Sequence, residues 1–179
     1  DDFNAGRLNF SRADGNQAAV INRGNLQAGP GGTIALLGAV VRNEGSIKAD
    51  GGTAALVSAR QLSLDFQGDG LTTFRIDPNN PASQALVQNA ATGVVQADGG
   101  RVAILADAGT AAQLVVNQQG VLRARSLVQR EGEIILGVGS DDRAEMGGVL
   151  DASGDVGLRG GKVSITGGGL YLNDQAVVD

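Results

Sequence analysis

The sequence predicts an all-β fold, a right-handed parallel β-helix with about 20–25 residues per coil. The first observation is that residues 22–36 and 43–56 repeat one pattern: Asn-x-Gly-x-apolar-x-Ala, a glycine-rich corner, then Thr-apolar-x-apolar. The second is that each copy holds two short segments of alternating apolar and polar residues, as half-buried strands do. The third is that the pattern returns at Gly93, Gly120 and Gly148. Repeats of this kind favour stacked coils.

Equivalent positions of the five copies carry the same kinds of residue. Two residues after the first glycine, the copies have Leu26, Ile47, Val95, Leu122 and Leu150. Four residues after it, they have Ala28, Ala49, Ala97, Ala124 and Ala152. After the corner, they have the pairs Ile34/Leu36, Ala54/Leu56, Val102/Ile104, Ile134/Leu136 and Val163/Ile165. The competing fold is an antiparallel β-sandwich, which does not explain why separated positions share residue types.

One copy cannot bury its apolar row alone, but strands that pair with their counterparts in the next coil bury a continuous column. Parallel strands lie about 4.8 Å apart, so about seven or eight coils would form a rod roughly 35 Å long. The crossover rule favours a right-handed coil. Glycines are expected to supply positive φ at the corners, and the alanines to leave room for an adjoining wall. Asn22 and Asn43 occupy equivalent corners and are expected to stack as an amide ladder.

We interpret residues 1–179 as a single β-helix segment. Residues 1–20 resemble a worn copy of the repeat, and residues 60–66 and 71–76 alternate as further strands. Prolines bound the next stretch, so residues 77–88 are predicted to form a protruding loop with a helical turn at residues 83–87. Shorter features complete the prediction: insertions near residues 125–130 and 139–147, and a last strand within residues 167–173.

Composition excludes several classes of function. The net charge is −5 and the pI about 4.7, so the chain lacks the basic surface that nucleic acids or anionic membranes require. It contains no cysteine and no histidine, which excludes disulfides, thiolate metal sites and a histidine-based triad. No apolar run approaches the ~18 residues of a membrane-spanning helix. The opening Asp-Asp-Phe-Asn is not a signal segment, so we expect any export signal to lie outside these residues.

Two groups of charged residues are candidate ligand sites. Asp65 and Asp69 flank a turn and have a spacing that offers oxygens to calcium, although aspartates beside glycine also cap turns, which we favour. The calcium-binding nonapeptide of β-rolls is not repeated here. Arg123, Arg125 and Arg130 are candidates for binding an anionic glycan, because Arg123 and Arg125 share strand parity. Solvent exposure without a ligand is the interpretation that we favour for them.

The densest charge cluster is a candidate catalytic site. Asp141, Asp142, Arg143 and Glu145 lie between two glycines, and as paired carboxylates they would need convergent geometry with a sugar cleft. We favour a solvated loop. Residues 159–162, Arg-Gly-Gly-Lys, lack the strand–loop–helix setting of a phosphate loop. We therefore predict no catalytic residue, no metal site and no cofactor, and the sequence identifies no ligand-binding residue.

Part of the chain resembles a known family. Residues 40–59 contain Asn-Glu-Gly-Ser-Ile-Lys-Ala-Asp-Gly-Gly-Thr-Ala-Ala-Leu, and residues 62–71 read Leu-Ser-Leu-Asp-Phe-Gln-Gly-Asp-Gly-Leu. Both are similar to the coils and the Leu-Asp-x-x-Gly-Asp-Gly-Leu stretch of filamentous-haemagglutinin-like exoproteins of two-partner secretion. The resemblance implies a right-handed parallel β-helix, export by a dedicated outer-membrane transporter of a Gram-negative bacterium, and adhesion at the cell surface.

These observations lead to a non-enzymatic segment of a secreted adhesin as the functional hypothesis. Its expected partners are the secretion transporter during export and a host-cell or glycan receptor. Exposed strand edges at the two ends of the stack also favour end-to-end self-association. A β-helix polysaccharide lyase or glycoside hydrolase is the alternative from another class. A stalk of a contact-dependent toxin-delivery exoprotein is the alternative within the same secretion class.

Overall fold

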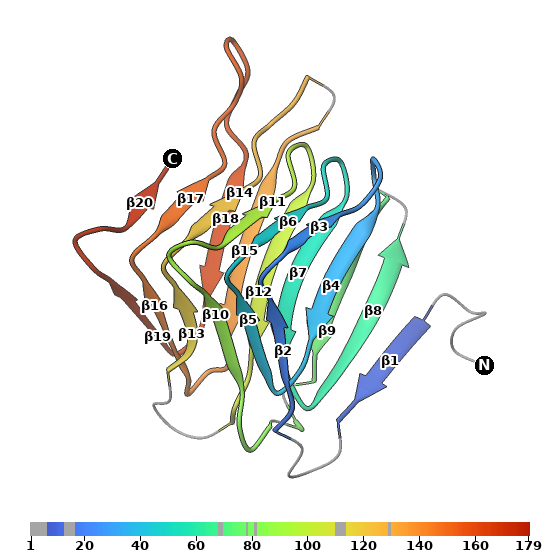
Figure 1. Ribbon diagram of the computed structural model, residues 1–179, viewed down its shortest axis with the longest axis vertical. Helices are drawn as coiled ribbons and strands as arrows, with labels where there is room; N and C mark the ends of the chain where they lie inside the picture. Colours follow the sequence, from blue (N-terminus) through green and yellow to red (C-terminus); the bar gives the residue numbers. More distant parts are fainter. Residues whose placement is uncertain are drawn as a thin grey trace.

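The computed structural model describes residues 7–12, 17–67, 70–77, 79–80, 82–109, 114–128 and 130–179. All regular structure in these residues is β-structure, and none of it is helical. The strands form three parallel sheets and one smaller antiparallel sheet (Figure 1). The prediction of an all-β fold with parallel strands is therefore confirmed for the described residues, and an antiparallel sandwich is excluded for the three larger sheets.

Each pass of the chain adds one strand to each of the three parallel sheets in turn. Sheet I contains β2 (Ala19–Asn22), β5 (Val40–Asn43), β10 (Leu86–Asn89), β13 (Leu114–Gln118), β16 (Arg143–Met146) and β19 (Gly169–Leu172). Sheet II contains β3 (Asn25–Gln27), β6 (Ser46–Lys48), β11 (Val94–Gln96), β14 (Val121–Arg123), β17 (Val149–Asp151) and β20 (Val177–Val178). Sheet III contains β4 (Thr33–Leu37), β7 (Thr53–Ser58), β12 (Arg101–Ala106), β15 (Glu133–Val138) and β18 (Lys162–Thr166).

The register of these sheets matches the predicted alignment of the copies. Leu26 pairs with Ile47, which pairs with Val95, and the file continues through Leu122 to Leu150. In sheet III, the predicted pairs after the corner also stand beside one another, from Ile34 and Leu36 to Val163 and Ile165. Like side chains therefore form continuous files along the stack, as the repeats predicted.

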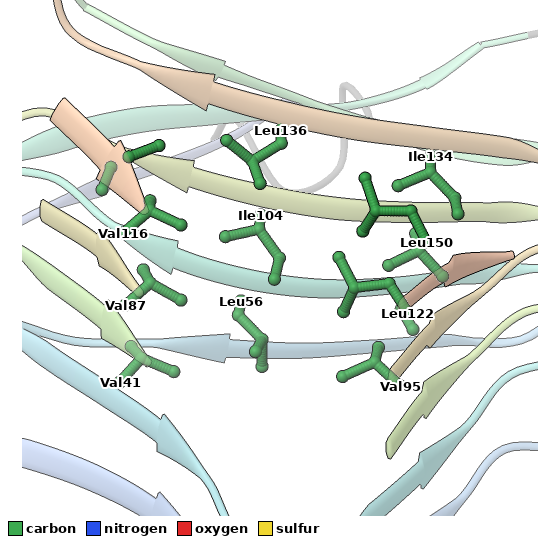
Figure 2. Packing of buried hydrophobic residues seen from close by; sticks show 14 of the residues in the cluster. Val41, Leu56, Val87, Val95, Ile104, Val116, Leu122, Ile134, Leu136 and Leu150 are labelled. Carbon is green, nitrogen blue, oxygen red and sulfur yellow. The ribbon is translucent and has the colours of Figure 1, made fainter. Parts of the chain in front are cut away.

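The three sheets share one hydrophobic core. Figure 2 shows Val41, Val87 and Val116 of sheet I and Val95, Leu122 and Leu150 of sheet II, with the sheet III residues Leu56, Ile104 and Leu136 between them. All nine side chains are fully buried. Aliphatic residues suffice here because each file needs only to fill a narrow space between three walls. The recurring alanines Ala49, Ala97 and Ala124 are also fully buried where sheet II turns towards sheet III.

Glycine is required along the stack for two different reasons. Gly31, Gly51 and Gly99 occupy equivalent corners with φ of 74°, 68° and 65°, as predicted. The first glycine of the later copies has another function, because a Cβ on Gly45 or Gly120 would overlap a backbone carbonyl oxygen of the preceding pass. Successive passes thus approach too closely at these points for any side chain.

A cover sheet lies against the outer face of sheet III. It consists of β1 (Arg7–Ser11), β8 (Gln61–Gln67) and β9 (Leu71–Ile76), with antiparallel pairing in the order β1–β8–β9 (Figure 1). Leu62, Leu64 and Phe74 of this sheet form a second hydrophobic cluster with outward-facing residues of sheet III, including Ala55 and Val57. As a result, all six residues of β7 are buried, on both faces of its sheet.

Two expectations are corrected by these elements and one is confirmed. The described part of residues 1–20 is not a further copy, because β1 pairs antiparallel with β8, and only β2 begins a pass. Five passes supply strands to all three sheets and β19 and β20 begin a sixth, fewer than the predicted seven or eight, because β1, β8 and β9 belong to the cover sheet. The prediction of strands at 60–66 and 71–76 is confirmed by β8 and β9.

Two predicted irregular regions also contain strands of sheet I. The loop predicted at residues 77–88 ends earlier, since Ala82 and Ala85 are buried, and the helical turn expected at residues 83–87 is wrong because β10 begins within it. The insertion predicted near residues 139–147 is a turn at residues 140–141 followed by the β16 strand from Arg143. The longer connection near residues 125–130 does separate β14 from β15.

Enlarging an alanine of the inner file tests the narrowness of the core. We expect Ala97→Leu to lower the free energy of unfolding by about 1–3 kcal/mol, because the added methyl groups have no free volume among three packed walls. The measurement is a urea unfolding curve followed by circular dichroism. Val156→Leu, at a fully exposed position, is the control and should leave the curve unchanged. Equal curves for Ala97→Leu and wild type would contradict the packing described here.

Candidate functional site

A ladder of amide side chains crosses the interior at the end of the sheet I strands. The Asn22 Nδ2 group donates to Asn43 Oδ1 at 2.8 Å, and the Asn43 Nδ2 group donates to Asn89 Oδ1 at 2.9 Å. This confirms the predicted stacking of Asn22 and Asn43 and extends it to Asn89. In the next pass Gln118 stands in register with Asn89, but its Nε2 group donates to the Gly120 carbonyl instead, at 2.9 Å. The ladder holds passes together and faces no solvent.

The third rung, Asn89, does not follow the spacing of the repeat. Asn22 and Asn43 each precede the first glycine of their copy by two residues, whereas Asn89 precedes Gly93 by four. The two additional residues displace the asparagine from the repeat pattern without displacing it from the register of the strands. The recurrence of an amide residue at the end of the first four sheet I strands, from Asn22 to Gln118, is the signal that points to it.

The arginines that were candidates for an anionic ligand are already paired. Arg123 makes a bidentate interaction with Asp98: its Nε atom lies 3.1 Å from both carboxylate oxygens, and its Nη2 atom donates to Oδ2. This hydrogen bonding raises the pKa of the Arg123 guanidinium. Arg125 Nε lies 3.0 Å from Asp151 Oδ2, and Arg130 donates to the Gly51 carbonyl at 3.0 Å. Arg123 and Arg125 therefore connect neighbouring passes of sheet II.

The corner aspartates of sheet II bind backbone as well as side chains. Asp50 Oδ1 accepts the Asp98 N–H, and Asp98 Oδ1 accepts the Arg125 N–H one pass further on. Burial raises the pKa of Asp50, but hydrogen bonds from Lys48, Gln96 and Asp98 outweigh it, so that the pKa lies below its ordinary value. These carboxylates are consequently occupied by the stack itself, which leaves them poorly suited to catalysis.

A second acidic cluster lies where sheet III turns back to sheet I. Asp142 is 1% exposed, and its Oδ2 atom accepts the Ala108 N–H at 2.8 Å. Asp107 is 8% exposed, and its Oδ1 atom accepts the Gly109 N–H. Burial raises the pKa of Asp107, and the negative charges of Asp142 and Asp141 raise it further. The solvated loop predicted for Asp142 is thus wrong, since this carboxylate is an interior acceptor.

The remaining members of the predicted charge cluster do not converge on a common site. Arg143 and Glu145 belong to β16, with Arg143 exposed and Glu145 half-buried. No ion pair within the part of the chain that the structure describes involves Asp107, Asp141 or Asp142. Nor do its acidic residues form a group of three or more suited to a metal ion. Asp65 lies in β8, whereas Asp69, its predicted partner in a calcium site, is outside the described residues.

A broad surface hollow runs along the glycine corners between sheets II and III. It has a volume of about 800 Å³, and its lining includes Gly31, Gly51 and Gly99. One wall is the connection between β14 and β15, in which Leu127 lies against Gly99 and Val128 is 86% exposed. We call this feature the corner groove. Its walls supply backbone and apolar surface, and of the acidic residues only Asp155 contributes to the lining.

The chain was compared with known proteins. A scan against protein-family models gives no match, and a search of curated proteins gives none either. Within the described residues, no helix is long and apolar enough to cross a membrane. Functional inference therefore depends on the geometry of the stack and on the pattern of its residues.

The amide ladder can be tested by removing its middle rung. Asn43→Ala removes one of the two acceptors of the Asn22 amide group and leaves Asn89 Oδ1 without its donor in the interior, so we expect a loss of about 1–3 kcal/mol of stability. The measurement is chemical unfolding compared with wild type. Asn25→Ala, an exposed asparagine in the same region, should change stability by less than about 0.5 kcal/mol. A loss no larger for Asn43→Ala than for Asn25→Ala would contradict a contribution of the ladder to stability.

The raised pKa of Asp107 predicts a pH-dependent gain in stability when this carboxylate is replaced by an amide. A raised pKa means that Asp107 holds its proton more tightly in the folded chain, so ionisation above that pKa disfavours folding. We expect Asp107→Asn to raise the unfolding midpoint at pH 7, and this gain to vanish as the pH falls below the ordinary aspartate value of 3.8. Thermal unfolding across pH 3–8 measures it, with exposed Asp174→Asn as the control for loss of one negative charge. A gain that persists at pH 3 would exclude titration as its cause.

Proposed function

We propose that this chain is a right-handed parallel β-helix and serves as a non-enzymatic structural and binding segment of a secreted bacterial surface adhesin. The observation that carries the proposal is the register of the passes, in which equivalent residues of up to six strands stand side by side in three parallel sheets. A stack of this kind grows along one axis by adding passes. It is suited to projecting a binding surface away from a cell.

The handedness and closure of the helix rest on two arguments. The sheets contribute to one hydrophobic cluster, as expected when three walls enclose a common interior. Consecutive strands of any one sheet are parallel and joined by crossovers, and such crossovers are right-handed in the great majority of proteins. The coil so formed has one wall from each sheet and a corner at each change of sheet.

The distribution of polar side chains favours binding over catalysis. Carboxylates of sheets II and III lie in ion pairs between passes, such as Arg101–Glu133 at 2.8 Å, or accept backbone N–H groups. Hydrolysis or elimination of a glycan requires at least two acidic or basic groups that converge on one cleft. The corner groove contains Asp155 as its acidic residue and Arg130 as its basic residue, and the latter donates to Gly51.

Export by two-partner secretion rests on the resemblance of residues 40–59 and 62–71 to that family. The fold is compatible with this route, because passes can form one after another as the chain emerges outside the cell. The outer-membrane transporter during export and a host-cell or glycan receptor afterwards are the proposed partners. Exposed apolar residues on the last strands, such as Leu172 and Val178, also favour end-to-end contact between copies.

The corner groove is the proposed receptor surface and can be tested directly. We expect the purified chain to bind host cells or immobilised glycans, and the double substitution Leu127→Ser/Val128→Ser to reduce binding about tenfold by removing apolar contact area. Tyr171→Ser, which removes an exposed side chain from β19, should bind as wild type does. Release of sugars or unsaturated uronates on incubation with the glycans would overturn the non-enzymatic proposal. Binding unaffected by the double substitution would exclude the groove.

A further inference from the structure

Two of the three outward files of sheet III are apolar over four strands and polar on the fifth, whereas the third, which runs from Thr33 through Arg101 to Lys162, is polar throughout. In one file the outward residues are Ala35, Ala55, Ala103, Ile135 and then Ser164. In the other file they are Leu37, Val57, Leu105, Gly137 and then Thr166. The change from apolar to polar therefore falls between β15 and β18. Outward apolar side chains on a sheet indicate that another layer packs against it.

The cover sheet ends one strand before the apolar surface does. Its last strand, β9, packs by Phe74 on Ala103, whereas Ile135 on the next strand of sheet III lies outside the second hydrophobic cluster and is only half-buried. Two hollows follow this margin, of about 150 and 420 Å³, and Phe74 and Leu105 line both. We call the continuous strip the β9 margin. Its floor is the part of the apolar face that the described cover sheet leaves open.

Beyond Thr72, whose N–H donates to Thr53 Oγ1 at 3.0 Å, the edge of β9 that faces away from β8 adjoins this strip. Among the described strands β9 pairs with β8 alone. The Asp77 N–H donates to the Gln61 carbonyl, so in the alternating antiparallel ladder Thr73 and Arg75 bond towards β8, and Phe74 and Ile76 present their backbone groups to the other side. A backbone edge beside an open apolar floor is the arrangement to which an extended peptide adds as a further strand.

The two ends of the β9 margin differ in charge. At one end Arg101 is paired with Glu133 at 2.8 Å, so this end carries little net charge. At the other end Asp107 and Asp141 line the larger hollow, and no lysine or arginine of the described residues forms an ion pair with them. The unpaired carboxylates lie at the Ile76 end of β9. A ligand that matches both ends is therefore cationic at the Ile76 end only.

We propose that the β9 margin binds an extended peptide of a partner protein as a fourth strand of the cover sheet. The peptide runs antiparallel to β9, places alternate apolar side chains on Leu105 and Ile135, and carries a lysine or arginine at its N-terminal end, beside Asp107 and Asp141. Backbone hydrogen bonds to Phe74 and Ile76 supply the pairing, and the acidic end fixes the direction. This inference does not depend on the adhesin proposal or on the corner groove.

The test uses a fluorescein-labelled peptide, Lys-Val-Thr-Val-Thr-Val, titrated with the full chain and followed by anisotropy. We expect saturable binding, about tenfold weaker binding of the peptide with glutamate in place of lysine, and loss of binding when proline replaces the central valine, since proline lacks the N–H donor and disrupts strand pairing. Equal binding of the proline peptide, or no binding of the lysine peptide up to millimolar protein, would overturn the proposal.

Matched variants locate the site. Ile135→Asp places a charge on the floor of the margin and should weaken binding at least about tenfold, whereas Ser164→Asp, in register one pass away, should leave it within about twofold. As a second readout, amide exchange at Phe74 and Ile76 should slow when the peptide binds wild type. Unchanged exchange at both amides, equal weakening by the two variants, or dimerisation through β9 that excludes the peptide would contradict a partner peptide at this edge.

Discussion

The structure depends on one constraint, the residue-for-residue register of parallel strands in successive passes. Because neighbouring strands lie about 4.8 Å apart, every side chain has its equivalents in the adjacent passes as its nearest neighbours. Each position must therefore hold either a residue that packs or hydrogen-bonds well with a residue of the same type, or a charged residue that faces one of opposite charge. The aliphatic files of Leu26 to Leu150, the amides of Asn22, Asn43 and Asn89, and the ion pairs between passes each satisfy this requirement. Glycine satisfies it where two backbones come too close for any Cβ, as at Gly45 and Gly120.

The same constraint explains why many polar side chains on the stack already have a partner in a neighbouring pass. A carboxylate at a corner meets the N–H group of the next pass at hydrogen-bond distance, as Asp50 meets Asp98 and Asp98 meets Arg125. Such a carboxylate stabilises the turn and loses the freedom to act on a ligand. Binding surfaces must then arise where the repeat is interrupted, since only there do side chains lack an equivalent neighbour. The connection between β14 and β15, which raises Leu127 and Val128 beside the glycine corners, is an interruption of this kind.

The inner half of the structure could be predicted from the sequence, and the outer half could not. The alternation of apolar and polar residues locates the strands of the clean copies. Their pairing follows from recurrence, because the residues of each inward file return in the sequence at a nearly fixed interval. The pairing of β1 with β8 bridges more than fifty residues without a repeat, and no local pattern specifies such a partner. The prolines at positions 78 and 81 predict a loop over residues 77–88, yet Val87 completes a core file between Val41 and Val116. The burial of Asp142 was missed for a related reason, since an acidic residue beside another resembles a solvated loop until the register places it under Ala108.

The outward residues of sheet III also indicate structure, although the repeat pattern does not include them. Alanine and valine at outward positions of β7 have no function in a solvent-facing wall, and the four consecutive apolar residues from Ala54 to Val57 are a sign of burial on both faces. The change from Ile135 to Ser164 along one outward file then marks where that second layer should stop. The cover sheet stops one strand earlier, at β9. An apolar outward file that runs beyond its cover thus defines both the position and the width of the uncovered strip, and the free edge of β9 determines that a strand is the element that fits it.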